Sequence, residues 1–142
     1  MDAVLLASTH LDWETPRDLY ERISANYGPF DLDPCATPET AKCARFFTPT
    51  DDGLKQPWAP CRAFVNPPYG REIGKWVRKA WDEAQRGAYV VMLIPARTDT
   101  NYWHDYVMRG EIEFLRGRLY FVRDGKTGRA PFPSAIVKFS LQ

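Results

Sequence analysis

The sequence predicts an α/β fold in which helices flank a mostly parallel β-sheet. Apolar residues alternate along the chain between helical spacing and short continuous runs, and no segment repeats. The run from Tyr89 to Ile94 is apolar throughout, as in a strand that is covered on both faces of a parallel sheet. A chain of 142 residues with 44% apolar content can bury one sizeable core. We therefore expect a single domain over residues 1–142, without a separate target recognition domain.

The first clear element is a helix over residues 16–27. Thr15 is a good N-cap residue, and Pro16 suits the first helical turn because its fixed φ fits a helix. Apolar residues follow at helical spacing, and Gly28 ends the pattern.

The segment after this helix is predicted to form only short elements. Residues 30–33 favour a short strand, which Pro34 ends because proline cannot donate to a sheet ladder. Prolines and glycines interrupt residues 35–60 repeatedly. We expect a helical turn near residues 40–44, a short strand near residues 45–48 and loop elsewhere.

The middle of the chain gives the strongest pattern, which is strand, tight loop and helix. Residues 63–65 form a short buried-strand run, and Asn-Pro-Pro-Tyr-Gly at 66–70 fits neither strand nor helix. A single apolar stripe then runs from Ile73 to Ala84 at helical spacing. The strand at 89–94 follows, and Asp99 or Thr100 should cap a further helix.

The C-terminal part is predicted to be mostly strand. Residues 112–115 and 119–122 flank a short turn, which suggests that they pair with each other. Residues 123–133 contain glycines and two prolines, so we expect a mobile loop there. Residues 134–139 alternate as a final strand.

Composition argues against export, membrane insertion and metal binding. The N-terminus has no basic region, and no stretch of about 18 apolar residues occurs, so we expect a cytoplasmic protein. The cysteines at 35, 43 and 61 are odd in number, and their spacing fits neither a disulfide framework nor a zinc site. We expect buried thiols and no metal.

Charge is distributed unevenly along the chain. Residues 1–60 hold five basic and ten acidic side chains, whereas residues 61–142 hold fourteen basic and eight acidic ones. A polyanion such as DNA should therefore meet the second half. Five cations cluster around the predicted mobile loop, where phosphate contact and simple solvation are equally compatible with the sequence. They are Arg116, Arg118, Arg123, Lys126 and Arg129.

The loop at 66–69 has the chemistry needed to methylate a planar amino group. It follows a predicted strand, at the sheet edge where open α/β folds bind ligands. The Asn66 side-chain oxygen and the Pro67 carbonyl would accept the amino hydrogens, and Pro67 and Pro68 would fix their directions. Tyr69 would offer a ring on which a base rotated out of the helix stacks. The alternative is a structural proline-rich turn.

Four motifs in this order resemble the phage DNA N6-adenine methyltransferase family, which is Dam-like and uses S-adenosylmethionine. The resemblance covers nearly the full length and implies methyl transfer to adenine N6, in the host cytoplasm if a phage encodes the chain. The motifs are Asp12-Trp13-Glu14-Thr15-Pro16, Phe30-Asp31-Leu32-Asp33-Pro34-Cys35-Ala36, Asn66-Pro67-Pro68-Tyr69-Gly70 and Met92-Leu93-Ile94-Pro95-Ala96.

The resemblance also implies where S-adenosylmethionine binds. Thr15, Pro16 and the start of their helix would meet the methionine carboxylate, which a helix N-terminus favours. Asp33 would lie by the amino-acid or ribose part, with Pro34, Cys35 and Ala36 in the loop beneath, and Asp52 would contact the adenine. The chain departs from the usual cofactor loop because no Gly-x-Gly follows Asp33.

The implied fold is a trimmed, Rossmann-like class I methyltransferase sheet with flanking helices. Residues 35–60 are too few for the two full strand–helix units that a complete methyltransferase fold would place there. Specificity for the target sequence should then be short or relaxed, and a homodimer could assist it. Two other functions stay open, namely methylation of a protein glutamine or an RNA amino group, and non-catalytic binding of nucleic acid.

Overall fold

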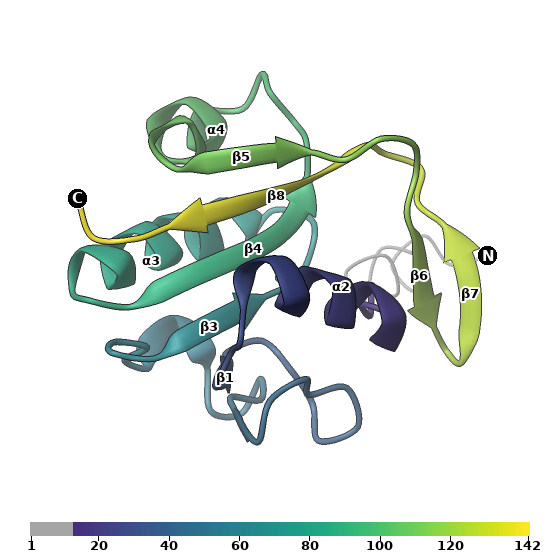
Figure 1. The fold of residues 1–142 in the computed structure, drawn as a ribbon, viewed down its shortest axis with the longest axis horizontal. Helices are drawn as coiled ribbons and strands as arrows, with labels where there is room; N and C mark the ends of the chain where they lie inside the picture. The colour runs from purple at the N-terminus through teal and green to yellow at the C-terminus, as the bar shows by residue number, and fades with distance from the viewer. Residues whose placement is uncertain (1–12) are drawn as a thin grey trace.

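The structure is a computed structural model that describes residues 13–142. A six-stranded mixed sheet forms its centre, with α2 over one face, α3 over the other, and a two-stranded hairpin set apart (Figure 1). The sheet contains β1 (Leu32–Asp33), β2 (Arg45–Phe46), β3 (Arg62–Val65), β4 (Tyr89–Pro95), β5 (Glu111–Phe114) and β8 (Ser134–Phe139). The hairpin contains β6 (Tyr120–Arg123) and β7 (Lys126–Arg129). The helices are α2 (Arg17–Tyr27), α3 (Ile73–Gln85) and α4 (Asn101–Asp105), with 3-10 turns η1 (Gly53–Lys55) and η2 (Val107–Arg109).

The sheet has the strand order β2-β1-β3-β4-β8-β5. Strands β1 to β4 are parallel, and β8 runs antiparallel to both β4 and β5. The chain moves from β1 to β2 on one side and then returns to β3 on the other side. The order therefore reverses between β1 and β3, and such a switch point leaves a crevice at the carboxyl ends of the two strands.

The two long helices form where the sequence predicts them. In α3 the apolar stripe is buried against the sheet, with Ile73, Val77, Ala80 and Ala84 almost inaccessible to solvent. In α2 the predicted cap was wrong. Pro16 is the N-cap residue and no side chain caps the helix, because the Thr15 hydroxyl accepts a hydrogen bond from Asn66 instead.

The pairing of the C-terminal strands differs from the prediction. Residues 111–114 pair with β8, and β6 pairs with β7, so the two predicted partners do not pair with each other. The segment predicted as a mobile loop contains β7, which a turn at Asp124-Gly125 joins to β6. Asp124 and Gly125 both have positive φ, at 53° and 74°, which is the backbone conformation of a type I′ hairpin turn.

The segment 35–60 is short and anchored by α3. The predicted helical turn lies slightly earlier, where the Ala41 amide donates to the Thr37 carbonyl, and β2 is shorter than expected. Near its end, the Trp58 and Ala59 amides donate to Glu83 Oε1 over 2.7 and 3.0 Å. A carboxylate on a helix thus holds a loop that has no regular structure.

The core lies on both faces of β3 and β4. The side chains of Phe64, Val91, Leu93 and Trp103 are all buried there. The three cysteines are free; Cys61 is buried, whereas Cys35 and Cys43 are half-buried, so the expectation of buried thiols holds for one of them. Within residues 13–142, no helix has the length and apolarity to cross a membrane.

Candidate active site

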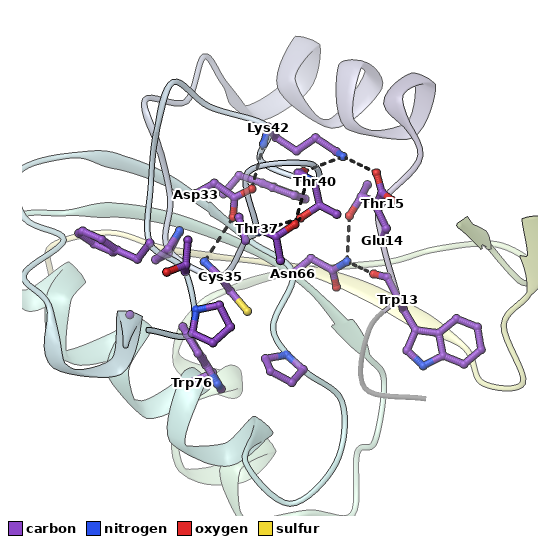
Figure 2. Close-up of a pocket in the computed structure, with 18 of the residues that line it drawn as sticks. Trp13, Glu14, Thr15, Asp33, Cys35, Thr37, Thr40, Lys42, Asn66 and Trp76 are labelled. Atoms are coloured by element: carbon purple, nitrogen blue, oxygen red, sulfur yellow. Dashed lines mark hydrogen bonds and ion pairs between the residues drawn. The ribbon is translucent and has the colours of Figure 1, made fainter. Parts of the chain in front are cut away.

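A cavity of about 660 Å³ opens at the carboxyl ends of β1, β2 and β3, where the strand order reverses (Figure 2). Its wall brings together most of the residues that the sequence singles out. These are Thr15, Asp33, Pro34, Cys35, Ala36, Asp52, Asn66 and Pro68. Three predicted residues, Pro16, Pro67 and Tyr69, do not line it. The cavity also includes residues that the sequence did not suggest, among them Lys42 and Trp76.

Asn66 lies directly after β3, and its amide is held from three sides. The Nδ2 group donates to the backbone carbonyl of Trp13 and to Thr15 Oγ1, the latter over 3.0 Å. The Oδ1 atom accepts a hydrogen bond of 2.7 Å from the Tyr69 hydroxyl. Because acceptors surround Nδ2 and a donor faces Oδ1, the amide has one fixed orientation. Oδ1 keeps a second lone pair for another donor.

Tyr69 is buried, unlike the exposed platform that its predicted role requires. Its ring makes T-shaped contacts with the rings of Phe121 and Phe132, with centroids 6.2 and 5.4 Å away. Its hydroxyl lies 2.7 Å from Asn66 Oδ1 and 3.0 Å from the Leu93 carbonyl, so its single hydrogen serves one of them at a time. Burial raises the pKa of Tyr69 well above its ordinary value, and the phenol stays neutral. Tyr69 does not line the cavity, and it contacts the site through its hydrogen bond to Asn66.

Asp33 ends β1 and is buried beside the cavity. Its Oδ2 accepts from the Lys42 amide over 3.0 Å, and Oδ1 accepts from the Cys35 amide over 3.4 Å. Burial raises the pKa of this carboxyl to about 6, although the two amide hydrogen bonds and the Lys42 charge act in the opposite direction. Asp33 therefore changes its charge close to neutral pH.

Lys42 and Glu14 form an ion pair in the cavity wall that sequence reasoning missed. Lys42 Nζ lies 3.4 Å from Glu14 Oε2 and 3.1 Å from the Thr40 carbonyl. Figure 2 marks these interactions with dashed lines. The pair joins residues 28 positions apart. Lys42 belongs to none of the four motifs, and Glu14 lies in the first of them without a predicted role, so only the tertiary structure reveals the pair.

The opposite wall is apolar and closely packed. A side chain at Gly53 would meet the Pro34 carbonyl at 2.1 Å and the Trp76 ring at 3.0 Å, so only glycine lets η1 approach these groups. Trp76 packs on Trp58 with centroids 6.2 Å apart, and Leu54 also faces the cavity. Asp52 uses Oδ1 to accept from the Leu54 amide over 3.2 Å. Gly53 provides a close backbone approach here, where the sequence lacks the expected Gly-x-Gly.

The β6–β7 hairpin forms the rim of the cavity. Glu14 and Val122 exchange two backbone hydrogen bonds of 3.0 and 2.9 Å, which join the hairpin to the segment before α2. The Arg123 guanidinium lies over the Trp13 ring, 4.5 Å from its centroid. Val122, Arg123 and Asp124 line the rim. In residues 13–142, no group of His, Cys, Asp and Glu side chains is arranged to hold a metal ion.

The sequence is similar to that of known proteins. Residues 4–135 match the model of the family described as DNA N-6-adenine-methyltransferase (Dam). The DNA N-6-adenine-methyltransferase of Escherichia phage T1 is 30% identical over 135 residues, which cover 83% of this chain and 56% of the relative. The protein of the same name from Haemophilus phage HP1 is 28% identical over 104 residues, or 72% and 60% of the two chains.

The chain thus spans somewhat more than half the length of these two relatives. The family match, by contrast, includes almost all of the chain and both predicted site segments, around Asp33 and Asn66. This confirms the resemblance that the four sequence motifs indicated. The chain belongs to the DNA N-6-adenine-methyltransferase (Dam) family.

Proposed function

We propose that this protein is an S-adenosylmethionine-dependent DNA methyltransferase that transfers a methyl group to N6 of adenine. The observation that carries the proposal is the fixed amide of Asn66 beside a cavity of cofactor size at the strand-order switch point. Family membership supports the same reaction. The relatives named for this activity are longer than this chain, so the activity of the chain itself is what has to be tested.

The residues present fit S-adenosylmethionine. A cavity of about 660 Å³ lies within the usual range for small-molecule sites, roughly 300–1,000 Å³. One wall carries apolar groups suited to a purine, including Leu54 and Trp76, and Asp52 lies at the same end. Asp33 can accept hydrogen bonds from ribose hydroxyls. When bound, the cofactor would supply an electrophilic methyl group on a sulfonium.

Asn66 would prepare the target nitrogen for attack. The lone pair of an exocyclic amino group is delocalised into the base, so the nitrogen becomes nucleophilic only when it turns tetrahedral. Asn66 Oδ1 can accept one amino hydrogen on its remaining lone pair, and the Pro67 carbonyl can accept the other. Trp13 and Thr15 hold Nδ2, which keeps Oδ1 as the acceptor. The amino proton is lost after methyl transfer, so no strong base is needed.

A stacking role for Tyr69 stays part of the proposal. The ring is 4% exposed and makes T-shaped contacts with Phe121 and Phe132, so a target base could stack on it only if the side chains packed around it moved. Both come from the hairpin and the segment that follows it. The hydroxyl of Tyr69 can orient Asn66 without such a movement.

The fold is best interpreted as a trimmed Rossmann-like class I sheet. The order β2-β1-β3-β4 corresponds to strands 2-1-4-5 of the doubly wound order 3-2-1-4-5-6, with the outermost strand 3 missing and antiparallel β8 lying next to β4. The short segment between β2 and β3 accounts for the missing strand. This interpretation explains why Asp33 and Asn66 meet at one cavity.

DNA is the proposed partner, and the hairpin is its proposed contact. Arg118, Lys126 and Arg129 are exposed and form no ion pair with any residue of the described part, 13–142. They lie on or beside a hairpin that rims the cavity, where DNA phosphates would flank an extruded base. The homodimer is a separate prediction, and sedimentation measurements of the mass in solution would test it.

The test is transfer of labelled methyl from S-adenosylmethionine to unmethylated DNA, with RNA and protein as competing substrates. We expect label in DNA as N6-methyladenine, and a loss of at least about a hundredfold in Asn66→Ala, since it removes a preorganised acceptor. Label only in protein or RNA would favour the alternative amino substrates. Cofactor binding without transfer to any of the three would favour a non-catalytic DNA-binding module.

A further inference from the structure

The ion pair between Lys42 and Glu14 is unusual because the lysine side chain is buried and both partners line the cavity. Only 5% of the Lys42 side chain is exposed, against 34% for Glu14, and both residues line the cavity (Figure 2). Lysine is rarely buried to this extent, because removing its charge from water is costly unless partners compensate. In an ordinary ion pair at the surface, by contrast, the lysine side chain would be largely exposed to solvent.

The pair leaves hydrogen-bonding capacity at both charges. Lys42 Nζ carries three hydrogens and uses two, for Glu14 Oε2 and the Thr40 carbonyl. The second oxygen of Glu14 has no hydrogen bond to any residue among 13–142. One cationic donor and one anionic acceptor therefore remain next to each other in the cavity wall.

We propose that Lys42 and Glu14 bind the zwitterionic amino-acid end of S-adenosylmethionine, with the α-carboxylate on Lys42 and the α-ammonium on Glu14. This inference rests on the proposed function. An α-amino acid carries opposite charges on adjacent groups, so a pair of opposite side-chain charges matches it without adding net charge to the site. A phosphate would be repelled by Glu14, and a purine or a ribose could use the pair only through uncharged hydrogen-bonding groups, which bind charged partners less strongly than an ammonium and a carboxylate do.

The position of the pair relative to Asn66 agrees with this assignment. Glu14 directly precedes Thr15, whose Oγ1 lies 3.0 Å from Asn66 Nδ2. Two methylene groups separate the α-carbon of the cofactor from its sulfonium, so an amino-acid end held here keeps the methyl group close to the Asn66 loop. The adenosine end is then left to the apolar wall at Leu54 and Trp76.

Asp33 is less suited to the ammonium than Glu14. Each of its carboxylate oxygens already accepts a backbone hydrogen bond, from Lys42 and from Cys35. Glu14 keeps one oxygen without a described partner and is more exposed to the cavity. Asp33 therefore supports the loop that carries Lys42, while Glu14 is available to the ligand.

Ligand analogues test the inference on the unmodified protein. Calorimetry should compare S-adenosylhomocysteine with 5′-methylthioadenosine, which lacks the amino-acid end, and S-adenosylmethionine with its decarboxylated form. Because a hydrogen bond to a charged group contributes about 1.5–3 kcal/mol, loss of the carboxylate should weaken binding about ten- to a hundredfold. Equal affinities within each pair would overturn the inference. No binding of S-adenosylhomocysteine would overturn the proposed function itself.

Substitutions then test whether Lys42 and Glu14 themselves bind the amino-acid end of the ligand. Lys42→Met and Glu14→Gln should weaken S-adenosylhomocysteine about ten- to a hundredfold and leave 5′-methylthioadenosine within about twofold. Lys42→Arg keeps the charge and should recover most of the affinity. Arg78→Ala is the matched control, since Arg78 is an exposed cation on α3 that pairs with Asp82 and does not line the cavity. Equal losses for both ligands would mean that the pair is purely structural, and the inference would fail.

Discussion

Replacing Glu83 by Gln should destabilise the protein by about 3 kcal/mol at neutral pH. Glu83 is 2% exposed, and its Oε2 lies 3.0 Å from Lys79 Nζ and 2.6 Å from Arg86 Nη1. Its Oε1 accepts the amides of Trp58 and Ala59. Burial alone would raise the pKa of this carboxyl, but the two amides and the two cations outweigh burial and lower the pKa to about 2.

The magnitude follows from that pKa. The ordinary value is 4.5, and each unit corresponds to 1.36 kcal/mol of preference for the charged form, which gives about 3 kcal/mol. A depressed pKa contributes stability that is present above pH 4.5 and lost as the pH falls toward 2. Glutamine resembles the protonated side chain in shape and charge. The Glu83→Gln protein should therefore lack this stability at every pH.

Urea unfolding followed by tryptophan fluorescence measures the difference. The gap between the two proteins should be about 3 kcal/mol at pH 7 and shrink to about 1 kcal/mol at pH 3, because Glu83 of the unfolded wild type takes up a proton below pH 4.5, whereas glutamine does not titrate. Asp82→Asn is the control on the same helix. Asp82 pairs with Arg78 at 3.7 Å near the surface, and its loss should cost no more than about 0.5 kcal/mol. A gap below 1 kcal/mol at pH 7, or one that is independent of pH, would refute this account of Glu83.

Three further predictions concern the cavity and its rim. Binding of S-adenosylhomocysteine should weaken as the pH falls below about 6, because burial raises the pKa of Asp33 to about 6 and protonation removes a hydrogen-bond acceptor. Calorimetry of Asp33→Asn should show a flatter dependence of affinity on pH. The same pH profile in the variant and the wild type would contradict the role of Asp33. The variants Arg118→Ala and Arg129→Ala should each reduce the steepness of log affinity for DNA against log salt concentration by about 1, without changing cofactor affinity. Slopes equal to that of the wild type would mean that the hairpin does not contact DNA. Tyr69→Phe should slow methyl transfer yet bind S-adenosylhomocysteine normally, because the lost hydroxyl orients Asn66; wild-type transfer by this variant would rule out that role.

The elements that the sequence predicts well have strong local patterns. The α3 stripe and the apolar run of β4 each specify one structure over many residues, and the Asn-Pro-Pro-Tyr loop between β3 and α3 has no regular alternative. Segment 35–60 lacks such a pattern. Its shape depends on Glu83, 24 residues beyond Ala59, and no local rule can anticipate that contact.

The prediction was also wrong about how the C-terminal strands pair, for a different reason. Strand β7, Lys-Thr-Gly-Arg, has no apolar run, so periodicity alone cannot identify it. The Asp124-Gly125 pair was a usable signal, because this dipeptide favours the type I′ turn that the positive φ values require. Residues 112–115 were instead assigned to the nearest strand in the sequence, whereas β5 has its partner in β8. Turn chemistry was the better guide there.

Stability and cofactor binding should be coupled through the loop that Glu83 holds. The Trp58 amide donates to Glu83, and the Trp58 ring donates from Nε1 to the Gly53 carbonyl over 2.9 Å. Gly53 in turn lies in the cavity wall against Pro34 and Trp76. A carboxylate on the far side of the loop therefore supports the cavity wall that we propose to hold the adenosine. Because this chain of contacts is continuous, a ligand that fills the cavity should stabilise the wild type more than Glu83→Gln.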